Sequence, residues 1–275
     1  MPRGEYEHRF TNATLRSVLK RDGEGEVGTA GRIRLAAVGD LRMAVERRDS
    51  LGPRFASVAE SADVLLLAGG LTASGLVSEA ETLADDLDSV GVPIVAVLGA
   101  RDHEIGQESL IRAMLTSLGW TVLDASSVVL DVRGLRLGIA GTTGFPGGFG
   151  IDYQLWDVVR EHRQADREQM HNARFAKALA GLKEQGADFR VALTHFSPVP
   201  GTLNGERETI RANLGNEILG AGIDASGADV AVHAMARRGT HEGRTPGGIP
   251  VYNVSQPVLG APYVVLDLPA PAFAG

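Results

Sequence analysis

The sequence predicts a single layered α/β domain that spans residues 31–268. Three observations lead to this fold class. Short apolar runs rich in β-branched residues recur along the chain and end in Gly, Asp or His, as buried strands do. Helix-like stretches separate several of these runs, and such alternation is typical of α/β layers. The chain of 275 residues, 44% of them hydrophobic, is long enough for one large core.

The elements follow in order along the chain. The expected strands are residues 33–38, 63–68, 94–98, 128–130, 135–140, 191–193, 230–232, 251–254 and 263–266. The expected helices are residues 53–61, 79–90, 108–118 and 158–182. Arg133 and Gly134 join two of the strands as a hairpin, and Ser78 and Glu81 have the spacing of a capping box. Residues 1–30 are expected to form a flexible N-terminal extension, and residues 269–275 a C-terminal tail.

Composition excludes several classes of protein. The net charge of −7 argues against general nucleic-acid binding, which requires a basic excess. No apolar run approaches the roughly 18 residues of a membrane span, so no membrane association is expected. The chain has no cysteine, which excludes disulfides and zinc–thiolate sites. The first residues lack the apolar region of a signal peptide, so a cytoplasmic location is expected.

The residues that follow the predicted strands are the first place to look for chemistry, because ligands bind at the carboxyl ends of strands in α/β sheets. These stretches are GDLR (39–42), GGLT (69–72), GARDH (99–103), THFSP (194–198) and HAMARRG (233–239). In order and approximate spacing they resemble the motifs of the calcineurin-like metallophosphoesterases. Those motifs are Gly-Asp-x-His, Gly-Asp, Gly-Asn-His-Asp/Glu, a lone His after a strand, and Gly-His-x-His.

The resemblance covers about residues 31–265 and implies an α/β/β/α sandwich in one domain. In the family, carboxylates, histidines and an asparagine hold two divalent metals that hydrolyse phosphoesters. Carried over by position, the seven metal ligands become Asp40, Arg42, Gly70, Ala100, His195, Met235 and Arg237. The neighbouring catalytic His becomes Arg101, whereas the acid after it survives as Asp102. Since only Asp40 and His195 keep a usable ligand atom, we expect neither a dinuclear centre nor any other cofactor.

Arginine replaces histidine at three of these positions, Arg42, Arg101 and Arg237. Against Asp40 they leave a charge of about +2, similar to that of a family site with two metals. Guanidinium groups bind phosphate oxygens well. The sequence therefore predicts a phosphate-bearing or other anionic small molecule as ligand, with Asp40, His195 and Asp102 beside the arginines. Random drift of a lost metal site is the alternative explanation.

Four functions remain open. The first is a non-catalytic relative that binds an anion in this arginine-lined pocket. The second is a scaffold that keeps the fold for contact with a protein partner. The third is a metal-free enzyme that uses His195 as acid or base, with Asp40 as the other candidate catalytic residue. The fourth is an ordinary metal-dependent phosphoesterase, which the lost ligands make the weakest of the four. His195 also has a purely structural interpretation, as a hydrogen-bonded histidine at a strand end.

Overall fold

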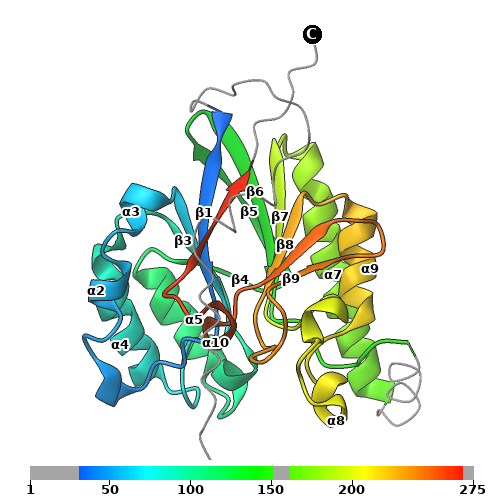
Figure 1. Ribbon diagram of the computed structural model, residues 1–275, viewed down its shortest axis with the longest axis horizontal. Coiled ribbons are helices and arrows are strands. Elements are labelled where there is room, and N and C mark those ends of the chain that lie inside the picture. Colours follow the sequence, from blue (N-terminus) through cyan, green and yellow to red (C-terminus); the bar gives the residue numbers. More distant parts are fainter. Residues whose placement is uncertain (1–30, 151–161, 269–275) are drawn as a thin grey trace, which may run out of the picture.

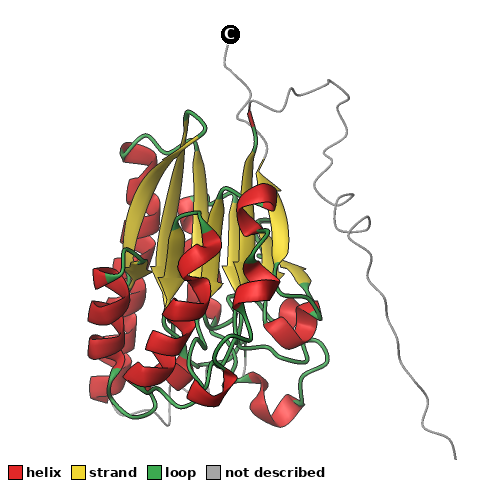
Figure 2. Ribbon diagram, turned by 90° about the vertical axis from the view of Figure 1, so that its left-hand side faces the viewer, coloured by secondary structure: helices red, strands yellow, loops and turns green. Residues whose placement is uncertain are grey.

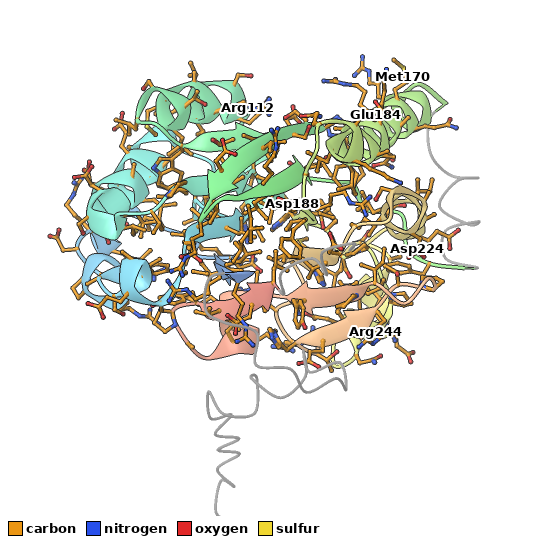
Figure 3. The ribbon with its side chains drawn as sticks, turned by 90° about the horizontal axis from the view of Figure 1, so that it is seen from above. Arg112, Met170, Glu184, Asp188, Asp224 and Arg244 are labelled. Carbon is orange, nitrogen blue, oxygen red and sulfur yellow. The ribbon has the colours of Figure 1, made fainter. Side chains whose placement is uncertain are left out.

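The computed structural model describes residues 31–150 and 162–268. The predicted N-terminal extension and C-terminal tail lie outside these residues, as does the start of the helix predicted at residue 158. Two sheets pack face to face, and a layer of helices covers the outer face of each (Figures 1 and 3). The predicted α/β/β/α sandwich is therefore confirmed.

The first sheet has five strands in the order β11-β1-β2-β3-β4. Their bounds are β1 Ile33–Val38, β2 Val64–Ala68, β3 Ile94–Val97, β4 Thr121–Leu123 and β11 Val264–Leu268. Neighbours from β1 to β4 pair in parallel, and only β11 runs antiparallel, with Leu35 opposite Leu266. All five side chains of β2 are buried, which explains its continuous run of apolar residues.

The second sheet has six strands in the order β5-β6-β7-β8-β10-β9. Their bounds are β5 Ser126–Val132, β6 Leu135–Thr142, β7 Phe189–Thr194, β8 Val230–His233, β9 Glu242–Arg244 and β10 Pro250–Asn253. The strands from β6 to β10 pair in parallel, while β5 and β9 run antiparallel at the two edges. The parallel strands end together at the lower side of the molecule, where most of the loops gather (Figure 2).

Helices on the two outer faces close the core. The first sheet is covered by α2 Gly52–Phe55, α3 Val58–Ser61, α4 Val77–Leu87 and α5 Glu108–Ser117. The second is covered by α7 His162–Glu184 and α9 Glu217–Ser226, with α8 Glu208–Arg211 and α10 Gln256–Leu259 in connections. Short 3-10 helices follow three of the strands, namely η2 Val45–Arg47, η4 Ala100–His103 and η5 Gly201–Leu203, and η3 Asp88–Val90 follows α4.

The core divides into three apolar layers that match this architecture. The layer between the sheets joins residues such as Leu35 and Leu66 from the first sheet with Val191 and Val232 from the second. A second layer lies between the first sheet and α2–α5, and a third lies between the second sheet and α7 and α9. Alternate residues of each strand enter different layers, so both faces of each sheet are buried.

All nine predicted strands are present, with ends shifted by up to two residues in most cases. The sequence analysis missed β4 and β9, which have three residues each, and the short helices α8, α9 and α10. The helix predicted at 53–61 is two helices, α2 and α3, separated by Ala56 and Ser57. The predicted capping box is wrong, because α4 begins at Val77 and Glu79 instead accepts hydrogen bonds from the amides of Leu76 and Ser74.

Within the described residues, no helix combines the length and apolar character that crossing a membrane requires.

Candidate functional site

The loops after β1, β2 and β3 lie side by side at the carboxyl ends of these strands. The amide of Arg42, in the first loop, donates to the carbonyl of Gly70, in the second, at 2.9 Å. The second sheet reaches the same place, because the amide of Gly39 donates to the carbonyl of Val254 at 2.8 Å. The amide of Leu71 donates to Oδ2 of Asp102 in the third loop at 3.1 Å, so three of the five stretches singled out in the sequence meet at this point. The ends of β7 and β8 adjoin them, through His195 at the carbonyl of Ala68 and Ala234 against Gly39.

Asp40 and Arg42 form the centre of this point. Both have left-handed backbones, with φ of 56° and 48°, a strained conformation that concentrates at functional sites. Asp40 is buried, and its Oδ2 accepts a hydrogen bond from the Ser255 hydroxyl at 2.7 Å. Its Oδ1 lies 3.7 Å from Nε of Arg42, beyond hydrogen-bond distance. Both of these atoms are buried without a hydrogen-bond partner, so this ion pair leaves polar groups unsatisfied.

The three predicted arginines act on one another. Burial lowers the pKa of Arg42, and the positive charges of Arg237 and Arg101 lower that pKa further, while Asp40 opposes them. Arg237 and Arg101 therefore each lie within electrostatic range of Arg42. Arg42 is about one-quarter exposed (26%) and the other two are exposed, so the cluster opens to solvent.

Glu104 changes the expected charge of the cluster. Its Oε2 forms an ion pair with Nη1 of Arg101 at 3.0 Å, and both side chains are about half exposed. Two carboxylates therefore stand against three arginines, which leaves about +1 rather than the +2 expected from the sequence. The Glu104 pair is at the surface, where an ion pair contributes little and exchanges readily with another anion.

His195 lies beneath the cluster and is 1% exposed. Its Nδ1 is 2.8 Å from the carbonyl oxygen of Ala68, so Nδ1 carries a proton and donates to that carbonyl. The ring packs tightly against two glycines: a Cβ on Gly69 would come within 2.7 Å of Nδ1, and one on Gly99 within 2.8 Å of Nε2. This packing and the hydrogen bond are what the structural interpretation of His195 requires.

Asp102 is not where the sequence analysis expected it. It is fully buried, and its two oxygens accept hydrogen bonds from the amides of Leu71, Thr72 and Gly99 and from the Thr72 hydroxyl, at 2.6 to 3.1 Å. Both oxygens are thus occupied by groups of the protein itself. Asp102 ties the loop after β2 to the loop after β3 and has no free oxygen for a ligand.

The remaining family positions offer no ligand atom suited to a hard divalent cation. Gly70 has φ of 63°, and a Cβ built on it would lie 2.6 Å from Oδ1 of Asp40. Ala100 and Met235 pack against the apolar layer under the second sheet. Across residues 31–150 and 162–268, no three His, Asp or Glu side chains gather in a way that would hold a metal ion. The side chains present therefore do not fit a dinuclear metal centre.

A buried network that the sequence analysis missed supports the loop of Arg237. His233 is fully buried, and burial lowers its pKa to about 3. Its Nδ1 donates to the carbonyl of Ala234 at 2.6 Å, and its Nε2 accepts from the Thr202 hydroxyl at 2.8 Å. Nδ2 of Asn253 donates to the carbonyl of Ala236, before Arg237, at 2.7 Å and to that of Thr240, after it, at 3.2 Å. The loop that presents Arg237 is thus fixed at both ends.

Two other residues at the site also escaped the sequence analysis. Glu104 directly follows the 3-10 helix that contains Arg101 and stands three residues after Arg101, a spacing that brings side chains together and could have revealed the pair. Ser255 donates to Asp40 across 215 residues of sequence, and no local pattern could have indicated that contact.

Comparisons with known proteins agree with the fold but assign no family. No protein-family profile matches the chain, and neither does any curated protein. Among solved structures, TT1561 of Thermus thermophilus is similar, with a TM-score of 0.53 and 13% identity over 82% of this chain and 90% of that one. GAP50, the anchor in the inner membrane complex of Plasmodium, has a TM-score of 0.51 and 13% identity over 82% and 72%.

A putative 5'-nucleotidase from Staphylococcus aureus has a TM-score of 0.50 and 12% identity. It aligns with 81% of this chain, which spans about half (48%) of the nucleotidase. Together with the sheet order, these likenesses define a layered α/β sandwich like that of the metallophosphoesterases. At such identities they establish the fold alone, so the function has to be argued from the site.

Proposed function

We propose that this chain is a non-catalytic protein of metallophosphoesterase-like fold that binds a phosphate-bearing or other anionic ligand between Arg42, Arg101 and Arg237. The observation that carries the proposal is the arginine cluster itself. Three guanidinium groups lie close enough for two of them to lower the pKa of the third, and Nε of Arg42 is buried without a partner. An anion placed among them relieves the repulsion and accepts their hydrogen bonds.

The surroundings support binding rather than metal-dependent hydrolysis. The position of the bridging carboxylate is Gly70, whose missing Cβ would collide with Asp40. Ala100 has no ligand atom and the thioether of Met235 suits only soft metals, whereas a divalent metal site needs three or four protein ligands. A positive cluster without a metal set attracts a phosphate group but lacks the metal-bound hydroxide that attacks the phosphoester in the family.

Thermal unfolding with added anions tests the proposal. Phosphate at roughly 100 times its dissociation constant stabilises the protein by about 2.7 kcal/mol, whereas sodium chloride at matched ionic strength does much less. Arg101→Ala and Arg237→Ala should each reduce the stabilisation by phosphate, since each removes one guanidinium group. Arg54→Ala is the matched control, because Arg54 is an exposed arginine of α2 on another part of the surface. Equal shifts with phosphate and chloride would refute anion binding.

Elemental analysis and a hydrolysis assay test the absence of metal chemistry. The purified protein is expected to hold no stoichiometric transition metal and to show no metal-stimulated hydrolysis of generic phosphodiesters. About two metal ions per chain, retained through dialysis, would contradict the proposal and favour an active phosphoesterase.

A further inference from the structure

Large exposed apolar side chains are concentrated beside the arginine cluster. Of seven such side chains in the described residues, four lie on the loops after β1, β2 and β3 or on the first turn of α5. They are Val45 (41% exposed), Leu76 (39%), Ile105 (48%) and Leu110 (61%), and we call them the apolar margin. Single exposed apolar residues are ordinary, but four at one sheet edge mark a contact surface.

Contacts between the loops bring the segments that carry these four residues side by side. The amide of Ala73 donates to the carbonyl of Met43 at 2.8 Å, which joins the first loop to the second. A Cβ on Gly75 would lie 2.9 Å from the carbonyl oxygen of Arg101, so the second loop lies against the third. The amide of Val77 donates to Oε1 of Gln107 at 3.1 Å, one residue before α5 begins.

The margin borders the arginines along the chain. Arg42 precedes Val45 by three residues, and Arg101 precedes Ile105 by four. In both loops the arginine is closer in sequence to the end of the strand, and the apolar residue comes later in the loop. A cationic centre is thus bordered by apolar side chains on the side formed by the first sheet.

We propose that this face docks a segment of another protein that carries a phosphorylated side chain flanked by apolar residues. The inference rests on the proposed function, since the phosphate group occupies the arginine cluster. A phosphorylated side chain carries nearly two negative charges and three acceptor oxygens, which complement the arginine forks. The flanking apolar residues cover the margin, which a free phosphate ion would leave in water.

The charge around the margin favours a protein over an anionic membrane. Glu46 is exposed one residue after Val45, and Glu104 is exposed one residue before Ile105. The chain as a whole carries a net charge of −7. These carboxylates would be repelled by a bilayer rich in anionic lipids, whereas a single phosphorylated segment reaches the arginines between them.

Calorimetric titration with four probes tests the inference. The probes are a phosphoserine peptide with two leucines on each side, the same peptide with glycines in their place, the unphosphorylated leucine peptide, and inorganic phosphate. The leucine phosphopeptide is expected to bind at least tenfold more tightly than the glycine phosphopeptide, and the unphosphorylated peptide at least tenfold more weakly than its phosphorylated form. Ile105→Ser and Leu110→Ser are each expected to lower the affinity for the leucine phosphopeptide at least threefold. Neither should change the affinity for inorganic phosphate.

Leu118→Ser is the matched control, because Leu118 is 58% exposed at the opposite end of α5, about 12 Å along the helix from Leu110. It should alter neither affinity. Equal binding of the two phosphopeptides overturns the inference while the proposed function stands. Binding to phosphatidylserine vesicles without binding to the leucine phosphopeptide overturns it in favour of a membrane. The proposed function itself is overturned if the wild-type protein binds no phosphate, or if Arg101→Ala leaves phosphate binding unchanged.

Discussion

Asp102 and Asp40 are two buried carboxylates on neighbouring loops, and the protein satisfies them very differently. Asp102 receives four hydrogen bonds from Leu71, Thr72 and Gly99, with none of its surface exposed. Asp40 receives one on Oδ2, from Ser255, while its Oδ1 has no partner. The oxygens of Asp102 both have hydrogen-bond partners within the protein, whereas Oδ1 of Asp40 and Nε of Arg42 have none.

This difference separates groups that the protein satisfies from groups that it leaves partly unsatisfied, at one sheet edge. A buried polar group that is fully hydrogen-bonded stabilises the fold, and its loss leaves several unsatisfied partners. A group left partly unsatisfied lowers stability, and a ligand that supplies the missing partner recovers it. His233 belongs with Asp102 in this respect, because both of its ring nitrogens have partners inside the protein.

The largest expected effect comes from Asp102→Ala. It leaves three buried amides without an acceptor and should lower the free energy of unfolding by about 3 to 5 kcal/mol. For a chain of this size that is a fall in Tm of roughly 10 °C. Asp40→Ala removes one hydrogen bond and should lower that free energy by about 1 kcal/mol. Thermal denaturation of the two variants measures both, and equal losses would remove the distinction between the carboxylates.

A pH dependence is expected from His233, whose pKa falls to about 3 in the folded protein against 6.5 as its ordinary value. Between these pH values the unfolded chain binds a proton at this residue that the folded protein does not. Stability due to the neutral ring is therefore complete above about pH 6.5 and declines as the pH falls, with a slope approaching about 1.4 kcal/mol per unit. Denaturant unfolding of wild type and His233→Gln from pH 7 to 5 compares the slopes, and the variant's should be shallower. Parallel curves would mean that His233 is not held neutral.

Gly70→Asp should destabilise the protein by about 1 to 3 kcal/mol. It restores a family carboxylate, yet it forces a side chain onto a left-handed backbone and brings a Cβ to 2.6 Å from Oδ1 of Asp40. Because metal binding and hydroxide formation act as a unit, no manganese-dependent phosphatase activity should appear. Calorimetry and a phosphodiester assay measure the two results. Turnover by this single variant would show that the other ligand positions are more capable than their side chains indicate.

The smallest expected effect is that of Glu104→Gln. Removing the carboxylate releases Arg101 from a surface ion pair worth less than about 1 kcal/mol. Phosphate affinity should rise about two- to fourfold, and stability without phosphate should hardly change. Calorimetric titration measures the affinity, and Glu60→Gln, an exposed glutamate of α3, is the control. A fall in affinity would show that Glu104 helps to orient Arg101 for the ligand.

The fold could be predicted from the sequence because buried strands leave a recognisable pattern of apolar residues. Runs such as those of β1 and β2 are apolar at nearly every residue, since both faces of each sheet are covered. Elements of three or four residues, such as β4 and α8, carry too little pattern to be recognised and depend on their neighbours. The start of α4 was misplaced for a related reason: two glutamates, Glu79 and Glu81, stand near the capping position, and only the packed chain selects Glu79.

For the site, the sequence by itself determined which residue types stand at the strand ends. Parallel strands end at a common edge, so Asp40, Arg42, Arg101, His195 and Arg237 could be assigned to one place. Only the tertiary structure decided the state of each group. It directs the oxygens of Asp102 inward to backbone amides, places Glu104 against Arg101, and leaves Oδ1 of Asp40 without a donor. Whether a hydrogen bond forms depends on differences of a few tenths of an ångström in the distance between atoms of loops that are remote in sequence. The spacing of residues along the chain carries no such information.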